Sequence, residues 1–208
     1  MTTVGVLALQ GDFVEHQAAL RRLGADVRQV RTPDGLRDLD GLIIPGGEST
    51  TFCRLMEDFN LYEPLRAVLK TGLPVWGTCA GLIVMAQRAA DFEYPTLDAL
   101  DITVRRNAFG RQVDSFEADV SIPALSAGSS RPFPAVFIRA PTVEEAGDGV
   151  EVLARLPADA GPAGGSPVAL RQGPLMATTF HPELADDDRF HRYFLDTVQQ
   201  QGRRSSPK

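Results

Sequence analysis

The sequence lacks the features of several classes of protein. Cysteine is scarce, with only Cys53 and Cys79 among 208 residues and no CxxC pair. We therefore expect no disulfide framework and two reduced thiols, as in a cytoplasmic protein. No apolar run approaches the roughly 20 residues that cross a bilayer, and no basic segment precedes an apolar core near the start. We expect neither a membrane span nor a secretory leader.

Basic residues are fewer than acidic residues. Lys and Arg number 21 against 27 Asp and Glu, a net charge of −6, which argues against a nucleic-acid groove because such grooves need a basic surface. The phosphate-binding patterns GxxxxGK[ST] and GxGxxG are absent, and the histidines and cysteines lack the spacing of metal ligands. The sequence therefore predicts neither a nucleotide site nor a metal site.

Strands and helices alternate in the first half of the chain. Short apolar runs typical of buried strands occur at residues 4–9, 25–31, 41–44 and 74–77. Helical stretches occur at residues 51–58, 62–71 and 82–88. Another helix is expected to start at Asp12, with Glu15 completing a capping box, and to end at Gly24. This alternation predicts a mainly parallel sheet with helices on both faces.

The second half is expected to add antiparallel strands to one side of that sheet. Strand-like stretches occur at residues 102–104, 116–122, 135–138, 150–156, 167–171 and 175–179. The acidic run 186–188 favours the start of a last helix that reaches about residue 200. Residues 126–134 and 159–166 are expected to be loops, and residues 201–208 a disordered tail. The predicted fold class is α/β, a three-layer sandwich in a single domain over residues 1–200.

The sharpest local signal is the pentapeptide GTCAG at residues 77–81, between an apolar strand and an apolar helix. It matches the nucleophile elbow G-x-S-x-G with Cys79 in place of serine. Glycines flank the nucleophile because a Cβ would clash in so tight a turn. The turn places the sulfur at a helix N-terminus, which favours the thiolate. A buried structural cysteine beside packing glycines is the alternative.

A thiol nucleophile needs a base and an acceptor that orients the base. His181 follows an apolar strand, at the sheet edge where the elbow also opens, and Glu183 lies two residues on. We expect Cys79, His181 and Glu183 to form a catalytic triad. A strand-end histidine and an acidic helix flank are the structural alternatives. His16 and His191 fall on expected helices, where a solvated or partly buried role is expected.

A third pattern, PGGEST at residues 45–50, ends a strand. Adjacent glycines let a backbone approach a ligand and aim N–H groups at an anion. A glycine turn that caps the next helix through Ser49 or Thr50 is the alternative reading.

Together these segments resemble the class I glutamine amidotransferases, and most closely the glutaminase subunits of pyridoxal 5′-phosphate synthases. The similar segments are residues 6–13, 45–50, 77–81, 105–112, 137–141 and 179–184. The resemblance runs from residue 4 to about residue 195, and only the loops at 126–134 and 159–166 depart from it, because they look longer than the family needs. It implies a flavodoxin-like core for the sandwich.

The resemblance also implies an activity. Such proteins hydrolyse L-glutamine to glutamate and ammonia and pass the ammonia to a separate (β/α)8-barrel synthase subunit, within a large hetero-oligomer. A chain of this kind binds no cofactor of its own. By similarity, Gly47 and Ala80 supply the oxyanion hole. The residues implied to line the glutamine site are Gly47, Glu48, Ser49, Arg106, Ile138 and Arg139.

Gln10 and Gly11 are expected near this site and near the partner surface. Because the glycine pair is flexible and ammonia released without an acceptor is wasted, we expect partner docking to organise the Gly46–Gly47 turn. Two other readings stay open: a cysteine peptidase or thiol hydrolase of a related fold, and a non-catalytic regulator or scaffold that has kept the fold.

Overall fold

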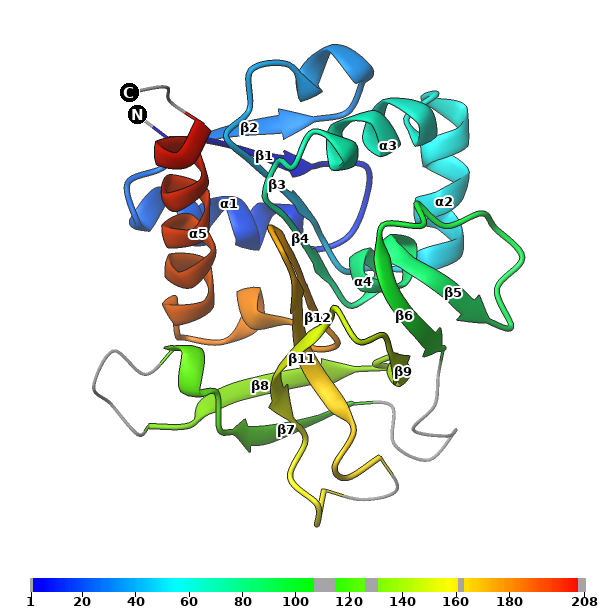
Figure 1. The fold of residues 1–208 in the computed structure, drawn as a ribbon, viewed down its shortest axis with the longest axis vertical. Coiled ribbons are helices and arrows are strands. Elements are labelled where there is room, and N and C mark those ends of the chain that lie inside the picture. Colours follow the sequence, from blue (N-terminus) through cyan, green and yellow to red (C-terminus); the bar gives the residue numbers. More distant parts are fainter. Residues whose placement is uncertain (1, 107–114, 126–130, 161–162, 206–208) are drawn as a thin grey trace.

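A seven-stranded sheet runs through the centre of the molecule in the computed structural model (Figure 1). The structure describes residues 2–106, 115–125, 131–160 and 163–205. The strand order is β10-β11-β12-β4-β3-β1-β2. Their bounds are β1 Thr3–Leu7, β2 Asp26–Val30, β3 Gly41–Ile44, β4 Val75–Thr78, β10 Glu151–Arg155, β11 Pro167–Gln172 and β12 Leu175–Thr178.

Five neighbouring strands, from β2 to β12, are parallel. Counted along the chain, their order is 2-1-3-4-5, which is the flavodoxin-like order. β3 and β4 are buried along their whole length, as expected of strands covered on both faces. The predicted parallel core is confirmed.

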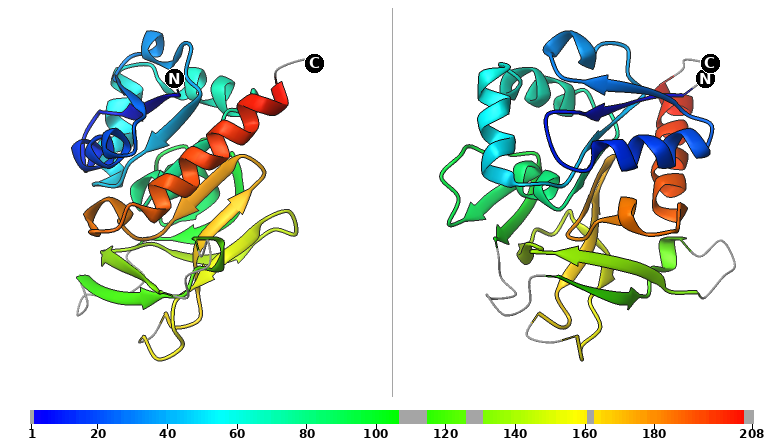
Figure 2. Two further views of the ribbon diagram at one scale, coloured as in Figure 1. Left: turned by 90° about the vertical axis from the view of Figure 1, so that its left-hand side faces the viewer. Right: turned by 180° about the vertical axis from the view of Figure 1, so that it is seen from behind.

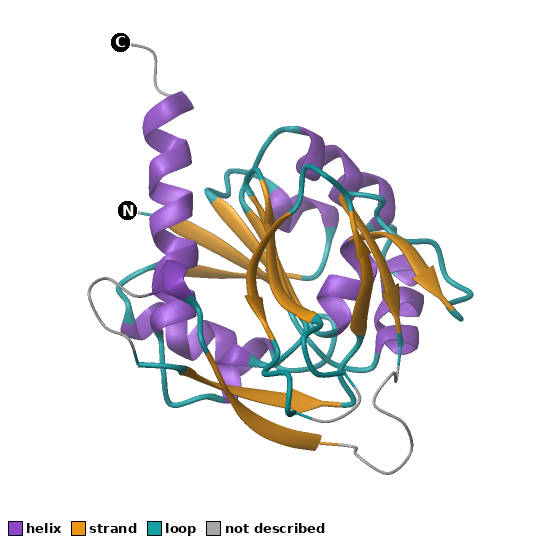
Figure 3. Cartoon of the chain, turned by 60° about the horizontal axis from the view of Figure 1, so that its bottom comes forward, coloured by secondary structure: helices purple, strands orange, loops and turns teal. Residues whose placement is uncertain are grey.

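Helices cover both faces of this sheet (Figures 2 and 3). The helices are α1 Phe13–Arg22, α2 Ser49–Asp58, α3 Tyr62–Lys70, α4 Ala80–Met85 and α5 Arg189–Ser205. Leu20 of α1 and Phe194 of α5 share one apolar cluster with Trp76. Phe52 of α2 and Leu65 of α3 belong to the cluster on the other face. The three-layer sandwich is therefore confirmed.

Contrary to expectation, the strands outside the parallel core do not all add antiparallel to one side of the main sheet: β5 to β9 lie outside that sheet, and β5 pairs parallel with β6. β11 pairs antiparallel with β12 and β10 at one edge of the main sheet. The other strands make two small sheets, β5-β6-β9 and β7-β8. Their bounds are β5 Ala86–Ala90, β6 Leu100–Arg105, β7 Ser115–Val120, β8 Phe133–Ile138 and β9 Thr142–Ala146.

Four further expectations, each about a single helix or strand, need correction, and the fourth concerns the last helix. The helix expected at 82–88 ends at Met85, and the chain continues at once as β5. The strand β9 was not predicted, because only Val143 and Ala146 of its five residues are apolar. Strand β8 begins at Phe133, inside the stretch expected as a loop.

The last helix is also longer than expected. It continues to Ser205, into the stretch expected as a disordered tail. Of the expected loops and tail, residues 126–130, 161–162 and 206–208 lie outside the described residues. No helix in the described part of the chain has the length and apolar composition that a membrane crossing needs.

Candidate active site

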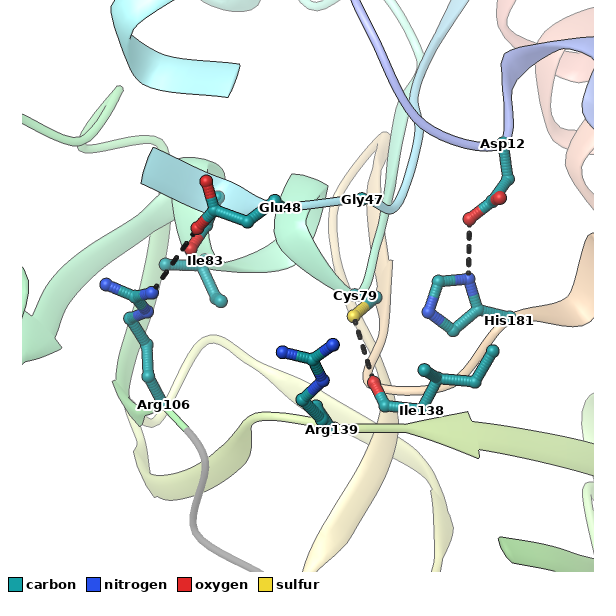
Figure 4. A pocket seen from close by; sticks show the side chains of 10 residues that line it. Asp12, Gly47, Glu48, Cys79, Ile83, Arg106, Ile138, Arg139 and His181 are labelled. Carbon is teal, nitrogen blue, oxygen red and sulfur yellow. Dashed lines mark hydrogen bonds and ion pairs between the residues drawn. The ribbon is translucent and has the colours of Figure 1, made fainter. Parts of the chain in front are cut away.

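A pocket of about 300 Å³ opens at the carboxyl ends of the parallel strands (Figure 4). In flavodoxin-like sheets, ligands bind at this edge. Residues that follow β1, β3, β4 and β12 all reach it, although they are far apart in the sequence. The lining residues are Asp12, Gly47, Glu48, Ser49, Cys79, Ile83, Arg106, Ile138, Arg139 and His181.

Cys79 occupies a strained turn between β4 and α4. Its φ of 47° lies in the left-handed region that side chains other than glycine rarely adopt. The flanking glycines allow the turn: a Cβ on Gly77 would lie 2.7 Å from the backbone of Gly81, and one on Gly81 would collide with the carbonyl oxygen of Ile44. The nucleophile elbow is therefore held by contacts between backbones that leave no room for a side chain.

The thiol group points into the pocket (Figure 4). Its Sγ lies 3.9 Å from the carbonyl oxygen of Ile138, which comes from β8 on the opposite wall. Ala80 begins α4, so its N–H belongs to the first helical turn, whose N–H groups have no partner within the helix. Ala80 is not among the lining residues of the pocket.

His181 follows β12 and faces Cys79 across the pocket. Its backbone N–H donates to the carbonyl of Val136, 2.8 Å away, which fixes the end of β12 against β8. Its Nδ1 lies 2.8 Å from Oε1 of Glu183, so the acid reaches back to the imidazole as expected. Glu183 lies behind the imidazole, outside the pocket, with a side chain that has no exposed surface.

The surroundings of His181 favour its charged form. Burial disfavours the imidazolium, but hydrogen bonds with Asp12, Cys79 and Glu183 outweigh burial and raise the pKa of His181 to about 12. An imidazolium beside Cys79 stabilises the thiolate, which is the nucleophilic form of cysteine. The structure thus brings together the three residues expected to form the triad.

Asp12 is a pocket residue that the sequence reading assigned another role. It occupies the N-cap position of α1, yet its side chain makes no capping hydrogen bond. Its carboxylate lies 3.2 Å from Nδ1 of His181 instead (Figure 4). The capping box expected from Asp12 and Glu15 is therefore wrong. The missed signal was position: Asp12 follows β1 and so reaches the same sheet edge as the elbow.

The turn after β3 lies directly beside His181, because a Cβ on Gly46 would collide with the imidazole ring. Gly47 has a φ of 141°, which a side chain would strain, and a Cβ there would collide with Gln10. The Gln10 amide donates to the carbonyl of Glu48 at 3.2 Å and accepts from the N–H of Glu48 at 3.3 Å. A side chain from the loop after β1 therefore clamps both backbone groups of Glu48, next to Gly47.

Glu48 caps α2, the role that the alternative reading gave to Ser49 or Thr50. Its carboxylate accepts from the N–H groups of Thr50 and Thr51 at 3.0 and 2.7 Å. Although burial acts in the opposite direction, the hydrogen bonds from Thr51 and Thr50 lower the pKa of Glu48 to about 2. Ser49 begins α2, is buried and lines the pocket.

Two arginines stand at the pocket (Figure 4). Arg106 lies 3.7 Å from the carboxylate of Glu48, and its guanidinium stacks over the ring of Phe92 at 5.1 Å. Arg139 follows β8 and has a φ of 41°, so it too adopts the left-handed conformation. The pocket thus offers two guanidinium groups that suit a carboxylate ligand. The neighbouring residues 107–112 of the RRNAFGRQ segment lie outside the described residues.

Within the described residues, one group of side chains could hold a metal ion. The ligand atoms of Asp12, His181 and Glu183 lie within 4.8 Å of one another. A metal ion bound there would need Nδ1 of His181, the atom that contacts both carboxylates.

The second cysteine, Cys53, is fully buried in α2, where burial raises the pKa of its thiol. Ile83 lines the pocket and was not predicted.

Comparison with known proteins agrees with this geometry. Residues 6–200 match the SNO glutamine amidotransferase family. The chain is 56% identical over 200 residues to the pyridoxal 5′-phosphate synthase subunit PdxT of Kineococcus radiotolerans, covering 95% of each chain. It is also 56% identical to the PdxT subunit of a Parafrankia species, covering 94% of this chain and 92% of that one.

A solved structure gives the same result. The crystal structure of a glutamine amidotransferase superposes with a TM-score of 0.84 at 47% identity, covering 94% of this chain and 98% of that one. The match in sequence extends over nearly the whole chain and includes every segment that builds the pocket. The chain therefore belongs to the SNO glutamine amidotransferase family.

Proposed function

We propose that this protein hydrolyses L-glutamine to L-glutamate and ammonia and supplies the ammonia to a synthase that makes pyridoxal 5′-phosphate. The observation that carries the proposal is the meeting of Cys79 and His181 in one pocket, with Glu183 hydrogen-bonded behind the imidazole. A second support is family membership, since relatives of nearly equal length are named as subunits of that synthase.

The substrate is proposed to bind between the elbow and the two arginines. The pocket volume of about 300 Å³ suits a ligand of the size of an amino acid. Arg139 or Arg106 would hold the α-carboxylate of glutamine as a guanidinium fork. Gly47, Glu48, Ser49 and Ile138 would form the walls, with the carboxylate of Glu48 engaged as the cap of α2.

Chemistry begins with attack by the Cys79 thiolate on the side-chain carbonyl carbon of glutamine. The His181 imidazolium then gives its proton to the departing nitrogen, so ammonia leaves and a thioester remains. Neutral His181 next takes a proton from water, which attacks the thioester and releases glutamate and the thiol. Glu183 fixes the tautomer of His181 and stabilises the imidazolium, as the acid of such triads does.

The negative oxygen that forms in both steps needs donors. We assign this role to the backbone N–H groups of Gly47 and Ala80, which follow β3 and β4 on neighbouring strands. Losing one donor of this kind typically lowers the rate by about 10²–10³. Because Gln10 clamps the peptide groups beside Gly47, we propose that docking of the synthase sets the orientation of this turn.

The partner is proposed to be a (β/α)8-barrel synthase subunit that assembles with this chain into a large hetero-oligomer. Such a partner would receive ammonia directly and so avoid its loss to solvent. The proposed dependence on docking has a simple measurement: glutaminase rates with and without the synthase subunit. A higher rate in the complex is expected, and equal rates would contradict the docking role of the Gly46–Gly47 turn.

The test of the proposed function uses the purified chain with its synthase subunit and glutamine. The wild-type complex should release glutamate and ammonia, and Cys79→Ala should lower the rate by at least about 10⁴-fold while the chain stays folded. A glutamine-analogue electrophile should label Cys79 and spare the matched control Cys53, which is buried and free. Hydrolysis of peptides in preference to glutamine, or equal labelling of both thiols, would refute the proposal.

A further inference from the structure

Two buried histidines lie behind the proposed triad, and the mechanism above does not use them. His16 comes from α1 and His191 from α5, and neither has any exposed surface. Nδ1 of His16 lies 2.9 Å from Nε2 of His191. Nε2 of His16 lies 3.2 Å from Oγ1 of Thr78 and 3.3 Å from Oε2 of Glu183. His16 therefore contacts both the acid and the residue that precedes Cys79.

Burial favours the neutral form of both rings. Burial, together with the nearby His191 and His181, lowers the pKa of His16 well below its usual value. Burial lowers the pKa of His191 to about 4. The nearby charges act in opposite directions on this pKa, since Asp188 raises it and Arg22 lowers it. Asp188 and Arg22 form an ion pair with each other at 2.6 Å. A neutral imidazole has one N–H donor and one bare nitrogen acceptor.

The contacts decide which nitrogen of His16 carries the hydrogen. Oε2 of Glu183 is buried and makes no hydrogen bond with a described residue, but it lies 3.3 Å from Nε2 of His16, whose hydrogen-bond partner is Oγ1 of Thr78. A bare nitrogen there would repel the carboxylate oxygen, whereas an N–H attracts it. The hydrogen therefore sits on Nε2, and the bare Nδ1 accepts the hydrogen bond of His191 Nε2–H.

The same tautomer assignment also accounts for Nδ1 of His191, the ring nitrogen that does not contact His16. Nδ1 of His191 is buried without a hydrogen-bond partner among the described residues. If the hydrogen of His191 is on Nε2, the atom left without a partner is a bare nitrogen acceptor and not an N–H donor. Buried N–H donors without a partner are rarer in native proteins than buried acceptors without one. His191 thus donates to His16, and the Nε2–H of His16 lies between Oγ1 of Thr78 at 3.2 Å and Oε2 of Glu183 at 3.3 Å, while the other oxygen of Glu183 pairs with His181.

We infer that His16 is a positioning residue for the acid of the triad: held as the Nε2–H tautomer by His191, it orients Glu183 from behind and ties it to Thr78. The inference rests on the proposed function, because it assigns His16 a role through Glu183. Without the N–H of His16, one oxygen of a fully buried carboxylate would lose the positive hydrogen of a ring nitrogen 3.3 Å away. The acid would then hold His181 less firmly or take up a proton.

The experiment compares His16→Leu with His16→Gln in the complex with the synthase subunit. Leucine keeps apolar volume but has no donor, whereas the amide nitrogen of glutamine can replace Nε2–H. We expect His16→Leu to lower kcat by about 10- to 100-fold, the range typical of groups that hold a catalytic ligand from behind, with KM within about twofold of wild type. His16→Gln should recover most of that loss.

The pH profile distinguishes positioning from packing. Because protonation of Glu183 becomes easier without the donor, His16→Leu should move the acid limb of kcat/KM to higher pH. The matched control is Phe194→Leu, since the ring of Phe194 packs on Trp76 at a centroid distance of 5.7 Å, as the ring of His16 does at 5.6 Å. The control should lower the melting temperature and leave kcat and the acid limb in place. Equal effects of the two leucine variants on kcat and on the limb would overturn the inference.

A readout without activity keeps the inference testable if the leucine variant fails to fold or if glutamine is not the substrate. Nitrogen-15 NMR of the full chain should show His16 protonated on Nε2, bare on Nδ1 and without titration between pH 6.5 and 9. Glu183→Gln should shift the Nε2 resonance of His16. A hydrogen on Nδ1, a ring that titrates in this range, or no shift in the variant would overturn the assignment independently of any glutaminase assay.

Discussion

Two strand-to-helix turns lie side by side at the pocket, after the neighbouring strands β3 and β4, and they are held in different ways. The turn after β4 carries Cys79 and is fixed by backbone contacts, because Gly81 packs against Ile44 with no room for a Cβ. The turn after β3 carries Gly47 and is held by the side chain of Gln10 through two hydrogen bonds. The nucleophile therefore stands on a turn that close packing makes rigid, whereas the proposed oxyanion donor stands on a turn that one side chain can release.

Because of this difference, the turn that carries Cys79 is fixed in position, whereas the turn that carries Gly47 can be moved. Packing against a neighbouring strand cannot change without disturbing the sheet, since cores are close-packed. An exposed side-chain hydrogen bond is worth about 1 kcal/mol net and can exchange with water or with a partner. A subunit that docks beside β1 could therefore reset the second turn without moving the first. Three substitutions test this contrast, in order of expected effect.

The largest effect is expected for Gly81→Ala. The new Cβ would collide with the carbonyl oxygen of Ile44, so β3 or the elbow must shift. We expect a loss of about 3 kcal/mol in the free energy of unfolding, or about 10 °C in melting temperature, and at least a 100-fold fall in glutaminase rate. Gly149→Ala is the matched control, because its Cβ would meet only a side-chain atom at 3.6 Å. Tolerance of Gly81→Ala would show that the elbow is not fixed by packing.

A smaller effect is expected for Gln10→Ala. Removal of the amide breaks both hydrogen bonds to Glu48, and the turn that carries Gly47 loses its clamp. We expect a fall of about tenfold in kcat of the complex, equivalent to about 1.4 kcal/mol in the barrier, with little change in melting temperature. A large fall in melting temperature would instead mean that Gln10 is part of the packing, as Gly81 is.

The smallest effect is expected for Glu48→Gln, which weakens the cap of α2. The carboxylate stabilises the fold only while it is ionised, and its pKa falls from its usual value near 4.5 to about 2 in the folded chain. The stability that the charge adds is therefore present above about pH 4.5 and is lost as the pH falls towards 2. Denaturant unfolding should show wild type more stable by about 1 kcal/mol at pH 7, with the gap closing at low pH. A gap that does not depend on pH would contradict this role.

The sequence predicts the parallel core well because its strands are continuous apolar runs between glycine-rich turns. β3 spans the predicted residues 41–44, and the elbow motif places Cys79 at a strand-to-helix turn as expected. The local pattern is sufficient there because the strand, the turn and the helix each carry their own signal. His181 and Glu183 follow from the same reasoning, since both come directly after a strand that ends at the pocket.

Contacts between distant segments account for what the sequence does not show. Asp12 has every local mark of an N-cap, yet its carboxylate binds His181, 169 residues away in the chain. The contacts of His16 with His191 and Glu183 likewise join residues that no local pattern relates. The early end of α4 has a similar cause, because residues 86–90 pair with β6 and this pairing overrides their helical pattern.

The two non-glycine residues with positive φ at the pocket, Cys79 and Arg139, have a consequence for engineering. Each such conformation costs on the order of 1–3 kcal/mol, which the surrounding fold must sustain. Glycine at either position would relieve that cost and remove the thiol or the guanidinium. Selection for heat resistance alone would thus reward the loss of these side chains, so a screen for robust variants should measure turnover together with melting temperature.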